Sequence, residues 1–416
     1  MRVAWLGPAP GTHGGAPYVG TQLLRELPQR GIEVDCFVAA EEDHIPPELL
    51  DEPGLRFFCQ SSGWQWNRWY SRGPMRAFFS GNLSRARVQF GLASLIASRH
   101  REQPYDLVYQ FSQSEMFGLR RRNGKLPPIV VHPSTHAAGE LKWHTKEAAL
   151  SRRCEPSWKR LLVRAVLHVR ARLQRRDMRL ARRVLPVSTR FGEHIVRDYG
   201  VLPERIGVVP NPIDLDLFSA HDEPRVDGPV RVLFVSRMSA RKGVDLVVEL
   251  SRRLDDLRGR VWIHAVGGAT TWSDYRPLLA DLNTAVAGFD GHLSPDELAD
   301  LYRTADVLIQ PSLYEPFALT VGEALASGVP VIASDEVGAV EGVDPAVCAV
   351  VAAGDLDGLE REVRRAVERT ERGEGHALRK LARAEAERLF APATIAAKLA
   401  EELELAAEWR PAAVVA

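Results

Sequence analysis

The feature that most constrains the fold is an alternation of short apolar runs with longer amphipathic segments. In the first half, the apolar run Arg2–Leu6 precedes a glycine-rich loop, a helical pattern over Tyr18–Gln29 and a second apolar run, Ile32–Ala39. Further strands are predicted at Leu107–Gln110 and Ile129–His132. Strands that alternate with helices in this way form parallel sheets with helices on both faces. The sequence therefore predicts an α/β fold built on a doubly wound parallel sheet.

The same alternation starts again after Pro229. Strands are predicted at Val230–Val235, Val261–Val266 and Asp306–Gln310, and a helix is predicted at Val244–Leu254. A chain of 416 residues is long enough for two such units. We therefore expect two Rossmann-like domains that face each other across a cleft.

Proline and turn residues mark the expected junction between the two halves. They cluster in the segment VVPNPIDLDLF, residues 208–218. We expect one domain over residues 1–207 and a second over residues 208–391. Residues 392–416 contain a last helix that is long enough to cross back to the first domain.

The composition limits the class of partner and the compartment. Lys plus Arg and Asp plus Glu each number 54, so no net charge draws the chain to nucleic acid. The four cysteines show no metal-ligand spacing, which favours a reducing compartment. The N-terminus has no signal-peptide pattern, and no apolar run reaches the ~20 residues of a membrane span. We expect a cytoplasmic protein that does not bind nucleic acid.

A basic segment over residues 151–183 has two interpretations. It holds twelve Lys and Arg residues against Glu155 and Asp177. It could be a solvated helix with an apolar seam, or an interfacial helix that contacts anionic lipid at the inner face of a membrane. The apolar residues that fall largely on one helical face are Leu161, Leu162, Ala165, Val166, Val169, Leu173 and Leu180.

An aromatic cluster could serve the same lipid contact. It lies in the sequence SGWQWNRWY and consists of Trp64, Trp66, Trp69 and Tyr70. These side chains could equally line an acceptor pocket or simply cover a core.

Two glutamates flank a predicted strand-to-helix connection. Glu315 lies in the loop after the strand Asp306–Gln310, and Glu323 lies in the first turns of a helix that begins near Thr320. Ligands bind at the carboxyl ends of strands in open α/β sheets, and a helix N-terminus attracts anions. A glutamate at a helix start also stabilises the helix dipole, which alone could explain Glu323 but not Glu315.

Two cations follow another strand of the same half. Arg237 and Lys242 lie in the loop SRMSARKG, at the carboxyl end of the strand Val230–Val235. A guanidinium and an ammonium group together suit a diphosphate, although either could be a solvated loop cation.

The first loop and the strand end at residue 132 offer weaker signals. Gly14 and Gly15 allow a close approach of the backbone to a phosphate or a sugar, but the loop lacks a complete dinucleotide fingerprint. His132 ends a predicted strand, and His136 follows it in the next loop. Chemistry alone assigns neither histidine, because a lone histidine is more often a packing or surface residue.

Together these segments resemble the GT-B glycosyltransferases of family 4 (glycosyl transferases group 1), which retain the anomeric configuration. The resemblance rests on SRMSARKG, on the Glu-x7-Glu pair in LYEPFALTVGEALASGVPVIASD, on VVPNPIDLDLF and on THGGAPYVGTQLLREL. It spans nearly the whole chain and is weakest over residues 40–105 and 140–185, where the acceptor-facing regions of this family vary.

The resemblance implies that residues 1–207 form an acceptor-binding domain and residues 208–391 a nucleotide-sugar-binding domain. It also implies a role for each charged residue. Glu323 would bind the ribose hydroxyls of a nucleotide-sugar donor. Glu315 would bind hydroxyls of the transferred sugar and stabilise positive charge at the anomeric carbon. Arg237 and Lys242 would hold the diphosphate and stabilise it as the leaving group.

Backbone groups would add to this site by the same resemblance. The N–H groups of Ala318, Leu319 and Thr320 would face the diphosphate at the helix start. Gly15, with Gly14 as a further candidate, would bring the backbone of the first domain to the same phosphates.

The resemblance also selects a histidine. The spacing of HAAGELK matches the His-x5-Lys pattern of one branch of the family, so His136 would contact the donor sugar and Lys142 would be the lysine. His132 is the second choice, and Asn211 in the interdomain segment is a further candidate.

The implied activity is retaining transfer of a sugar from a nucleotide-diphosphate sugar to a hydroxyl acceptor, which could be a glycan, a lipid-linked acceptor or a small molecule. Two cations on the diphosphate make a divalent metal or other cofactor unnecessary. The alternatives are a GT-B phosphorylase or sugar-phosphate synthase with a small acceptor, and a non-catalytic nucleotide-sugar-binding scaffold. Ala318 departs from the glycine usual in the family, but no charged position of the motifs is lost.

Overall fold

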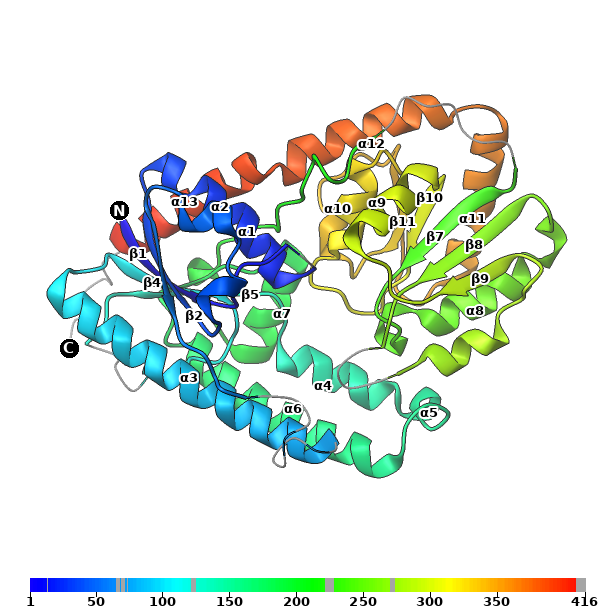
Figure 1. Ribbon diagram of the computed structural model, residues 1–416. Coiled ribbons are helices and arrows are strands. Elements are labelled where there is room, and N and C mark those ends of the chain that lie inside the picture. Colours follow the sequence, from blue (N-terminus) through cyan, green and yellow to red (C-terminus); the bar gives the residue numbers. More distant parts are fainter. Residues whose placement is uncertain are drawn as a thin grey trace.

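Two parallel six-stranded sheets form the two halves of the molecule (Figure 1). The computed structural model describes residues 1–12, 14–64, 68, 72, 74–120, 125–220, 228–269 and 274–408. The strand order is β3-β2-β1-β4-β5-β6 in the first sheet and β12-β11-β10-β7-β8-β9 in the second. Both orders reverse beside a central strand, which confirms the predicted doubly wound α/β fold.

The first half contains six strands and seven α-helices within the described residues. Its strands are β1 (Arg2–Gly7), β2 (Glu33–Val38), β3 (Leu55–Cys59), β4 (Leu107–Ser112), β5 (Ile129–Pro133) and β6 (Arg183–Val184). Its helices are α1 (Ala16–Glu26), α2 (Pro47–Leu50), α3 (Pro74–Glu102), α4 (Ala137–Lys146), α5 (Ala148–Ser151), α6 (Ser157–Met178) and α7 (Thr189–Tyr199).

The second half repeats this plan and ends in three long helices. Its strands are β7 (Val230–Val235), β8 (Val261–Val266), β9 (Ala287–Asp290), β10 (Val307–Gln310), β11 (Val331–Ser334) and β12 (Cys348–Val351). The helices of this half are α8 (Val244–Arg253), α9 (Pro295–Thr304), α10 (Leu319–Ala326), α11 (Leu356–Glu371), α12 (Gly375–Phe390) and α13 (Pro392–Glu408).

The central strands are buried on both faces because helices cover each side of a sheet. Along β1, Val3 and Trp5 join one apolar cluster while Ala4 and Leu6 join another. The first of these clusters contains side chains of α1 and α13, and the second contains side chains of α3 and α7. Such two-sided burial explains why these strands read as continuous apolar runs.

The C-terminal helix returns to the first half, as predicted. Ile395, Leu399 and Leu403 of α13 are fully buried in the same cluster as β1 and β4. Figure 1 shows α12 beside the second sheet and α13 beside the first, so the two helices together cross the molecule. The first sheet ends at Val184 and the second begins at Val230. The domain boundaries at 207/208 and 391/392 stay predictions.

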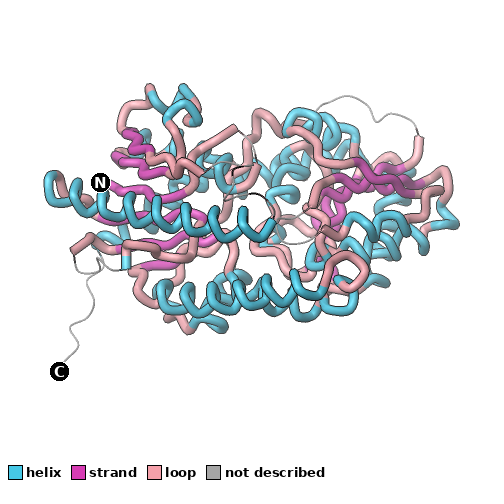
Figure 2. Tube along the Cα trace, turned by 60° about the horizontal axis from the view of Figure 1, so that its bottom comes forward, coloured by secondary structure: helices cyan, strands magenta, loops and turns pink. Residues whose placement is uncertain are grey.

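Helix α6 differs from the seam expected in the basic segment. Its buried face includes Val163 and Leu167, whereas Leu161 is 70% exposed and Val169 is 56% exposed. The expected apolar seam is therefore not the face that packs on the protein. Figure 2 brings forward the face of the molecule along which α3 and α6 run.

Two smaller expectations also change. The helix expected over residues 18–29 begins at Ala16 and ends at Glu26, because Pro17 suits a first helical turn and Pro28 opens a separate short turn. Trp66, Trp69 and Tyr70 lie outside the described residues. Trp64 donates a hydrogen bond of 2.8 Å to Ser80.

Across the described ranges, no helix has both the length and the apolar character needed to cross a bilayer.

Candidate functional site

Two loops of the second domain meet where β7 and β10 end. After β7 the chain forms a short 3-10 turn, Ala240–Lys242, and Gly243 then adopts φ 79°. A side chain at Gly243 would overlap the carbonyl of Pro311, so only glycine allows this approach. The N–H of Leu313 donates to the carbonyl of Arg241 over 2.7 Å. The loop after β10 is thereby fixed to the loop that carries the cations.

This junction brings Lys242 into an ion pair with Glu315. Their side chains are only 14% and 11% exposed. Burial and the nearby guanidinium groups of Arg241 and Arg237 lower the pKa of Lys242. Arg237 itself is exposed. An anionic ligand that joined these cations would stabilise the protonated lysine.

Helix α10 begins beside this ion pair, one residue earlier than expected. Ala318 precedes the first helical residue with φ 78°, in the left-handed region that is rare for residues with a side chain. Leu319 opens the helix, and the hydroxyl of Thr320 donates to Gln310 over 3.1 Å. The helix start thus lies between Glu315 and Glu323 along the chain.

Glu323 lines a pocket of about 470 Å³ between the two domains. Tyr302 donates a hydrogen bond of 3.1 Å to its carboxylate. Burial raises the pKa of Glu323 to about 7 although this hydrogen bond opposes the shift. Gly14, Gly15 and Tyr18 of the first domain line the same pocket. The structure therefore brings the predicted glycine loop and the second glutamate together.

The glycine loop has backbone angles that favour glycine. Gly14 and Gly15 have φ values of 47° and 67°, and Gly15 precedes the first residue of α1. A side chain at either position would meet no atom within 4 Å. The angles and not the packing therefore require glycine here, and the backbone stays open to a ligand.

The two histidines occupy buried positions in the first domain. The ring of His132 has Nδ1 2.5 Å from the Tyr109 hydroxyl, and burial lowers its pKa to about 3, so it is neutral. His136 has Nε2 2.9 Å from Asp198 and Nδ1 2.5 Å from the hydroxyl of Tyr314. A direct contact of His136 with a donor sugar would require the ring to leave one of these partners.

The remaining candidates lie apart from the charged cluster. Lys142 is exposed on α4, and Asn211 is buried in the interdomain segment. Asp214 of the same segment accepts hydrogen bonds from Tyr18, over 2.5 Å, and from Gln22, over 3.2 Å. These bonds fix the segment to α1.

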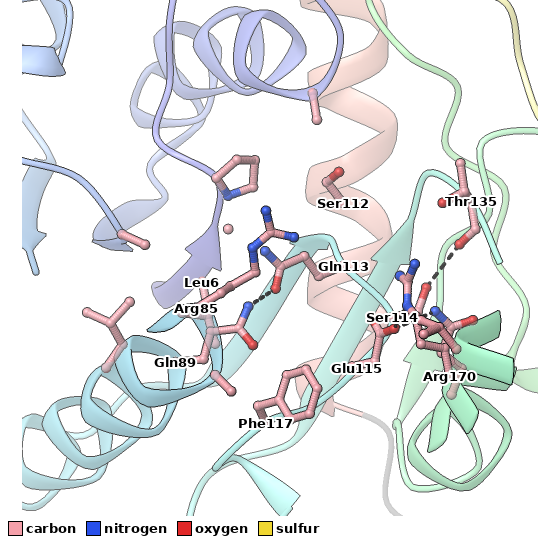
Figure 3. Close-up of a pocket in the computed structure, with 18 of the residues that line it drawn as sticks. Leu6, Arg85, Gln89, Ser112, Gln113, Ser114, Glu115, Phe117, Thr135 and Arg170 are labelled. Carbon is pink, nitrogen blue, oxygen red and sulfur yellow. Dashed lines mark hydrogen bonds and ion pairs between the residues drawn. The ribbon is translucent and has the colours of Figure 1, made fainter. Parts of the chain in front are cut away.

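A second pocket, of about 830 Å³, lies in the first domain where β1 and β4 end (Figure 3). Side chains of α3 and α6 complete its walls. Figure 3 shows Arg85, Gln89 and Gln113 along one side and Glu115 with Arg170 along the other. Arg170 donates to Glu115 over 2.6 Å, and Gln89 donates to Gln113. This pocket combines apolar walls with several polar groups, as small-molecule sites do.

The sequence did not indicate several of these residues. Glu115 and its neighbours follow β4, so the rule that ligands bind at strand ends could have selected them. Tyr302, Tyr18 and Tyr314 carry no sequence signal of their own, because their roles depend on contacts between distant segments.

Two facing Rossmann-like domains, with charged side chains where their strands end, define the GT-B class of proteins. Two family models match the chain: "Glycosyltransferase Family 4" over residues 13–217 and "Glycosyl transferases group 1" over residues 219–384. A D-inositol 3-phosphate glycosyltransferase from Acidothermus cellulolyticus is 30% identical over 348 residues, covering 79% of this chain and 72% of that protein. The chain belongs to the family 4 glycosyltransferases.

Solved structures share the fold across nearly the whole chain. A sucrose-phosphate synthase from Thermosynechococcus elongatus has a TM-score of 0.69 at 21% identity, covering 96% of this chain and 98% of that one. HepE from Anabaena, in complex with UDP and glucose, has a TM-score of 0.65 at 20% identity, covering 97% and 99%. The family membership makes the protein an enzyme, a glycosyltransferase, so the alternative of a non-catalytic scaffold is not supported.

Proposed function

We propose that the protein transfers a sugar, with retention of configuration, from a nucleotide-diphosphate sugar to a hydroxyl acceptor. The observation that carries the proposal is the arrangement around α10. The Lys242–Glu315 pair lies before the helix start, and Glu323 lies after it, in a pocket closed by the glycine loop of the first domain. One donor that spans this arrangement would use every charged residue of the motif.

The parts of the donor would take separate positions. The ribose would lie in the pocket at Glu323, with its hydroxyls donating to the carboxylate. The diphosphate would lie against Arg237, Lys242 and the N–H groups of residues 318–320, and the backbone of Gly14 and Gly15 would approach it from the first domain. The transferred sugar would then face Glu315.

The charged residues of the site match the charges that develop when the bond between sugar and phosphate is cleaved. Cleavage of the bond between sugar and phosphate builds negative charge on the diphosphate and positive charge on the anomeric carbon. Lys242 and Arg237 would stabilise the first charge, and the Glu315 carboxylate the second. Attack on the same face, with the departing phosphate taking the acceptor proton, would retain the configuration. We expect no divalent metal, because two cations already meet the diphosphate.

The comparisons support a nucleotide sugar and a small acceptor. HepE is described in complex with UDP and glucose, and the Acidothermus relative is named for inositol 3-phosphate. We propose that the acceptor enters the pocket of about 830 Å³, since Ala16 lines it while the adjacent Gly15 lines the donor pocket. Two substrates would then meet across the start of α1.

The roles of the other candidates stay proposals. His136 would contact the donor sugar only after releasing Tyr314 or Asp198. His132, Lys142 and Asn211 have no contact in the structure that favours a direct role over a structural one.

A panel of nucleotide sugars tests the proposal. The protein should release nucleoside diphosphate from at least one donor, and Lys242→Ala should lower kcat/KM by about 100-fold or more. Glu323→Ala should mainly raise the Kd for the nucleotide. NMR of the product should show the anomeric configuration of the donor. Inversion would contradict the retaining mechanism, and turnover that requires phosphate or a sugar phosphate would favour the phosphorylase or synthase alternative.

Peripheral membrane contact through residues 151–183 is a second part of the proposal. Trp158 and Leu161 of α6 are exposed apolar side chains, with Lys159 and Arg160 between them. Exposed apolar and basic residues on one helix suit an anionic lipid surface. The protein would then act in the cytoplasm at the inner face of the membrane, where a lipid-linked acceptor is the alternative to a small one.

A further inference from the structure

The first domain holds the loop that carries Glu315 on both sides of that glutamate. The preceding residue, Tyr314, has its hydroxyl 2.5 Å from Nδ1 of His136, at the start of α4. The following residue, Pro316, accepts a hydrogen bond of 2.8 Å from the hydroxyl of Ser188, at the start of α7. Glu315 belongs to the second domain, but its loop takes its position partly from the first.

The tautomer of His136 decides which group donates the hydrogen bond between His136 and Tyr314. Burial opposes ionisation of Asp198, but hydrogen bonds from His136 and Arg197 outweigh it and hold the Asp198 pKa well below its usual range. An ionised Asp198 accepts from Nε2 of His136. In the tautomer with its proton on Nε2 alone, Nδ1 accepts from the hydroxyl of Tyr314.

Two glycines make room for these contacts. A side chain at Gly139, in the first turn of α4, would have its Cβ 2.5 Å from Cε1 of His136 and 2.6 Å from the hydroxyl of Tyr314. A side chain at Gly338 would overlap both the Pro316 carbonyl and the Ser188 hydroxyl. Both contacts with the loop therefore depend on the absence of a neighbouring side chain.

The start of α4 is also fixed to the pocket of the first domain. Gln174 accepts a hydrogen bond of 2.7 Å from the N–H of Ala137, the residue after His136. The same Gln174 donates over 2.9 Å to Glu115, which lines the pocket of about 830 Å³. A chain of hydrogen bonds thus connects that pocket with the loop of Glu315.

We propose that Tyr314, with His136 and Ser188, positions Glu315 for catalysis by holding its loop against the first domain. Tyr314 and Ser188 are positioning residues, because they act through Glu315 and not on the substrate. Loss of the contact would remove the anchor of this loop on α4, while the carbonyl of Glu315 keeps the N–H of Gly338 and its carboxylate keeps Lys242. The inference rests on the proposed role of Glu315 at the transferred sugar.

The decisive variant is Tyr314→Phe, which keeps the ring and removes the hydroxyl. We measure hydrolysis of UDP-glucose, or of whichever nucleotide sugar the panel shows to be turned over, together with the Kd for the matching nucleoside diphosphate. We expect kcat to fall about tenfold or more, while KM and the Kd change less than twofold. An unchanged Kd also shows that the variant is folded.

The matched control is Tyr105→Phe. Its buried hydroxyl donates over 2.5 Å to Asp35 within the first domain, and its ring packs against Phe37. This variant should keep the wild-type kcat. Equal kcat values for the two variants, with an active wild type, would overturn the inference and leave the proposed function intact.

Gly139→Ala provides a second test by adding atoms instead of removing them. The new methyl group should displace the Tyr314 ring and lower kcat, although alanine is the better helix former. Gly20→Ala is its control, since its Cβ would meet Phe111 at an ordinary 3.5 Å. Unaltered kcat in Gly139→Ala would count against the inference. A wild type that turns over no donor would overturn the proposed function as well.

Discussion

At the scale of single residues, the site is marked by unusual physical states. Ala318 and Ser112 are the non-glycine residues with positive φ among those that the structure describes, at 78° and 63°. Ala318 precedes α10, and Ser112 lines the pocket of the first domain. Strained backbone of this kind persists where the surrounding structure enforces it, often at functional sites.

The strain at Ala318 leads to a stability prediction. Left-handed backbone costs a residue with a side chain about 1–2 kcal/mol, and glycine avoids this at a smaller entropic cost. Ala318→Gly should therefore raise the free energy of unfolding by about 0.5–1 kcal/mol, measured by urea denaturation. The same exchange at Ala324, buried within α10, should lower it by about 1 kcal/mol or more. A loss of stability in Ala318→Gly would contradict this account.

The raised pKa of Glu323 leads to a pH prediction. Because its folded pKa is about 7, the neutral carboxyl is favoured in the folded protein, and Glu323 lowers stability as pH rises from about 4.5 to 7. Ribose hydroxyls would favour the charged form, so affinity for the nucleotide sugar that the panel shows to be turned over should rise between pH 6 and 8. Calorimetry at several pH values measures this, and Glu323→Gln should remove the dependence. A wild-type affinity that is flat over this range would argue against Glu323 as the ribose ligand.

At the scale of elements, helices pack according to contacts that sequence spacing reveals only in part. The apolar spacing of α6 indicated a helix but selected the wrong face, because Val163 and Leu167 are buried while Leu161 is exposed. The strands at residues 55–59 and 183–184 and the long helix α3 were not predicted, since none has a clear apolar period. By contrast, the ends of β7, β10 and α10 were predicted within a residue or two, because glycine and proline mark them.

The charged residues of the site were predictable from the sequence, but the contacts between the domains were not. Glu315, Glu323, Arg237 and Lys242 follow strand ends or begin a helix, so local sequence was sufficient to group them. The contact of His136 with Tyr314 joins residues 178 positions apart, and no local pattern encodes it.

The return of α13 to the first sheet leads to a third prediction. Leu399 is fully buried in the cluster of β1 and α1, so Leu399→Ala should lower the free energy of unfolding by about 2–5 kcal/mol. Leu405 of the same helix is 53% exposed, and Leu405→Ala should change it by less than about 0.5 kcal/mol. Denaturation midpoints of the two variants give the comparison, and equal effects would mean that α13 does not pack as described.

At the scale of the whole molecule, the exposed face of α6 is the surface to test against lipid. Binding to vesicles that contain anionic lipid should weaken as salt increases. Replacement of four exposed arginines by glutamine should weaken binding by about 100-fold or more, at about 1 kcal/mol for each cation. The four positions are Arg164, Arg172, Arg175 and Arg176.

The control replaces four exposed arginines of the second domain in the same way. These are Arg252, Arg258, Arg361 and Arg365. Equal loss of binding in the two variants would mean that net charge, and not α6, drives the contact. Vesicle binding that neither variant changes would remove the main support for a lipid-linked acceptor.

The chain crosses between the domains twice, and the two crossings are joined. Ile213 of the interdomain segment donates a hydrogen bond of 2.9 Å to the carbonyl of Phe390, two residues before α13 begins. Two crossing segments that are bonded to each other can serve as a hinge between the domains. A rotation of one domain about this pair of bonded segments would stretch neither crossing, whereas the contact of Tyr314 with His136, which joins other parts of the two domains, would have to open.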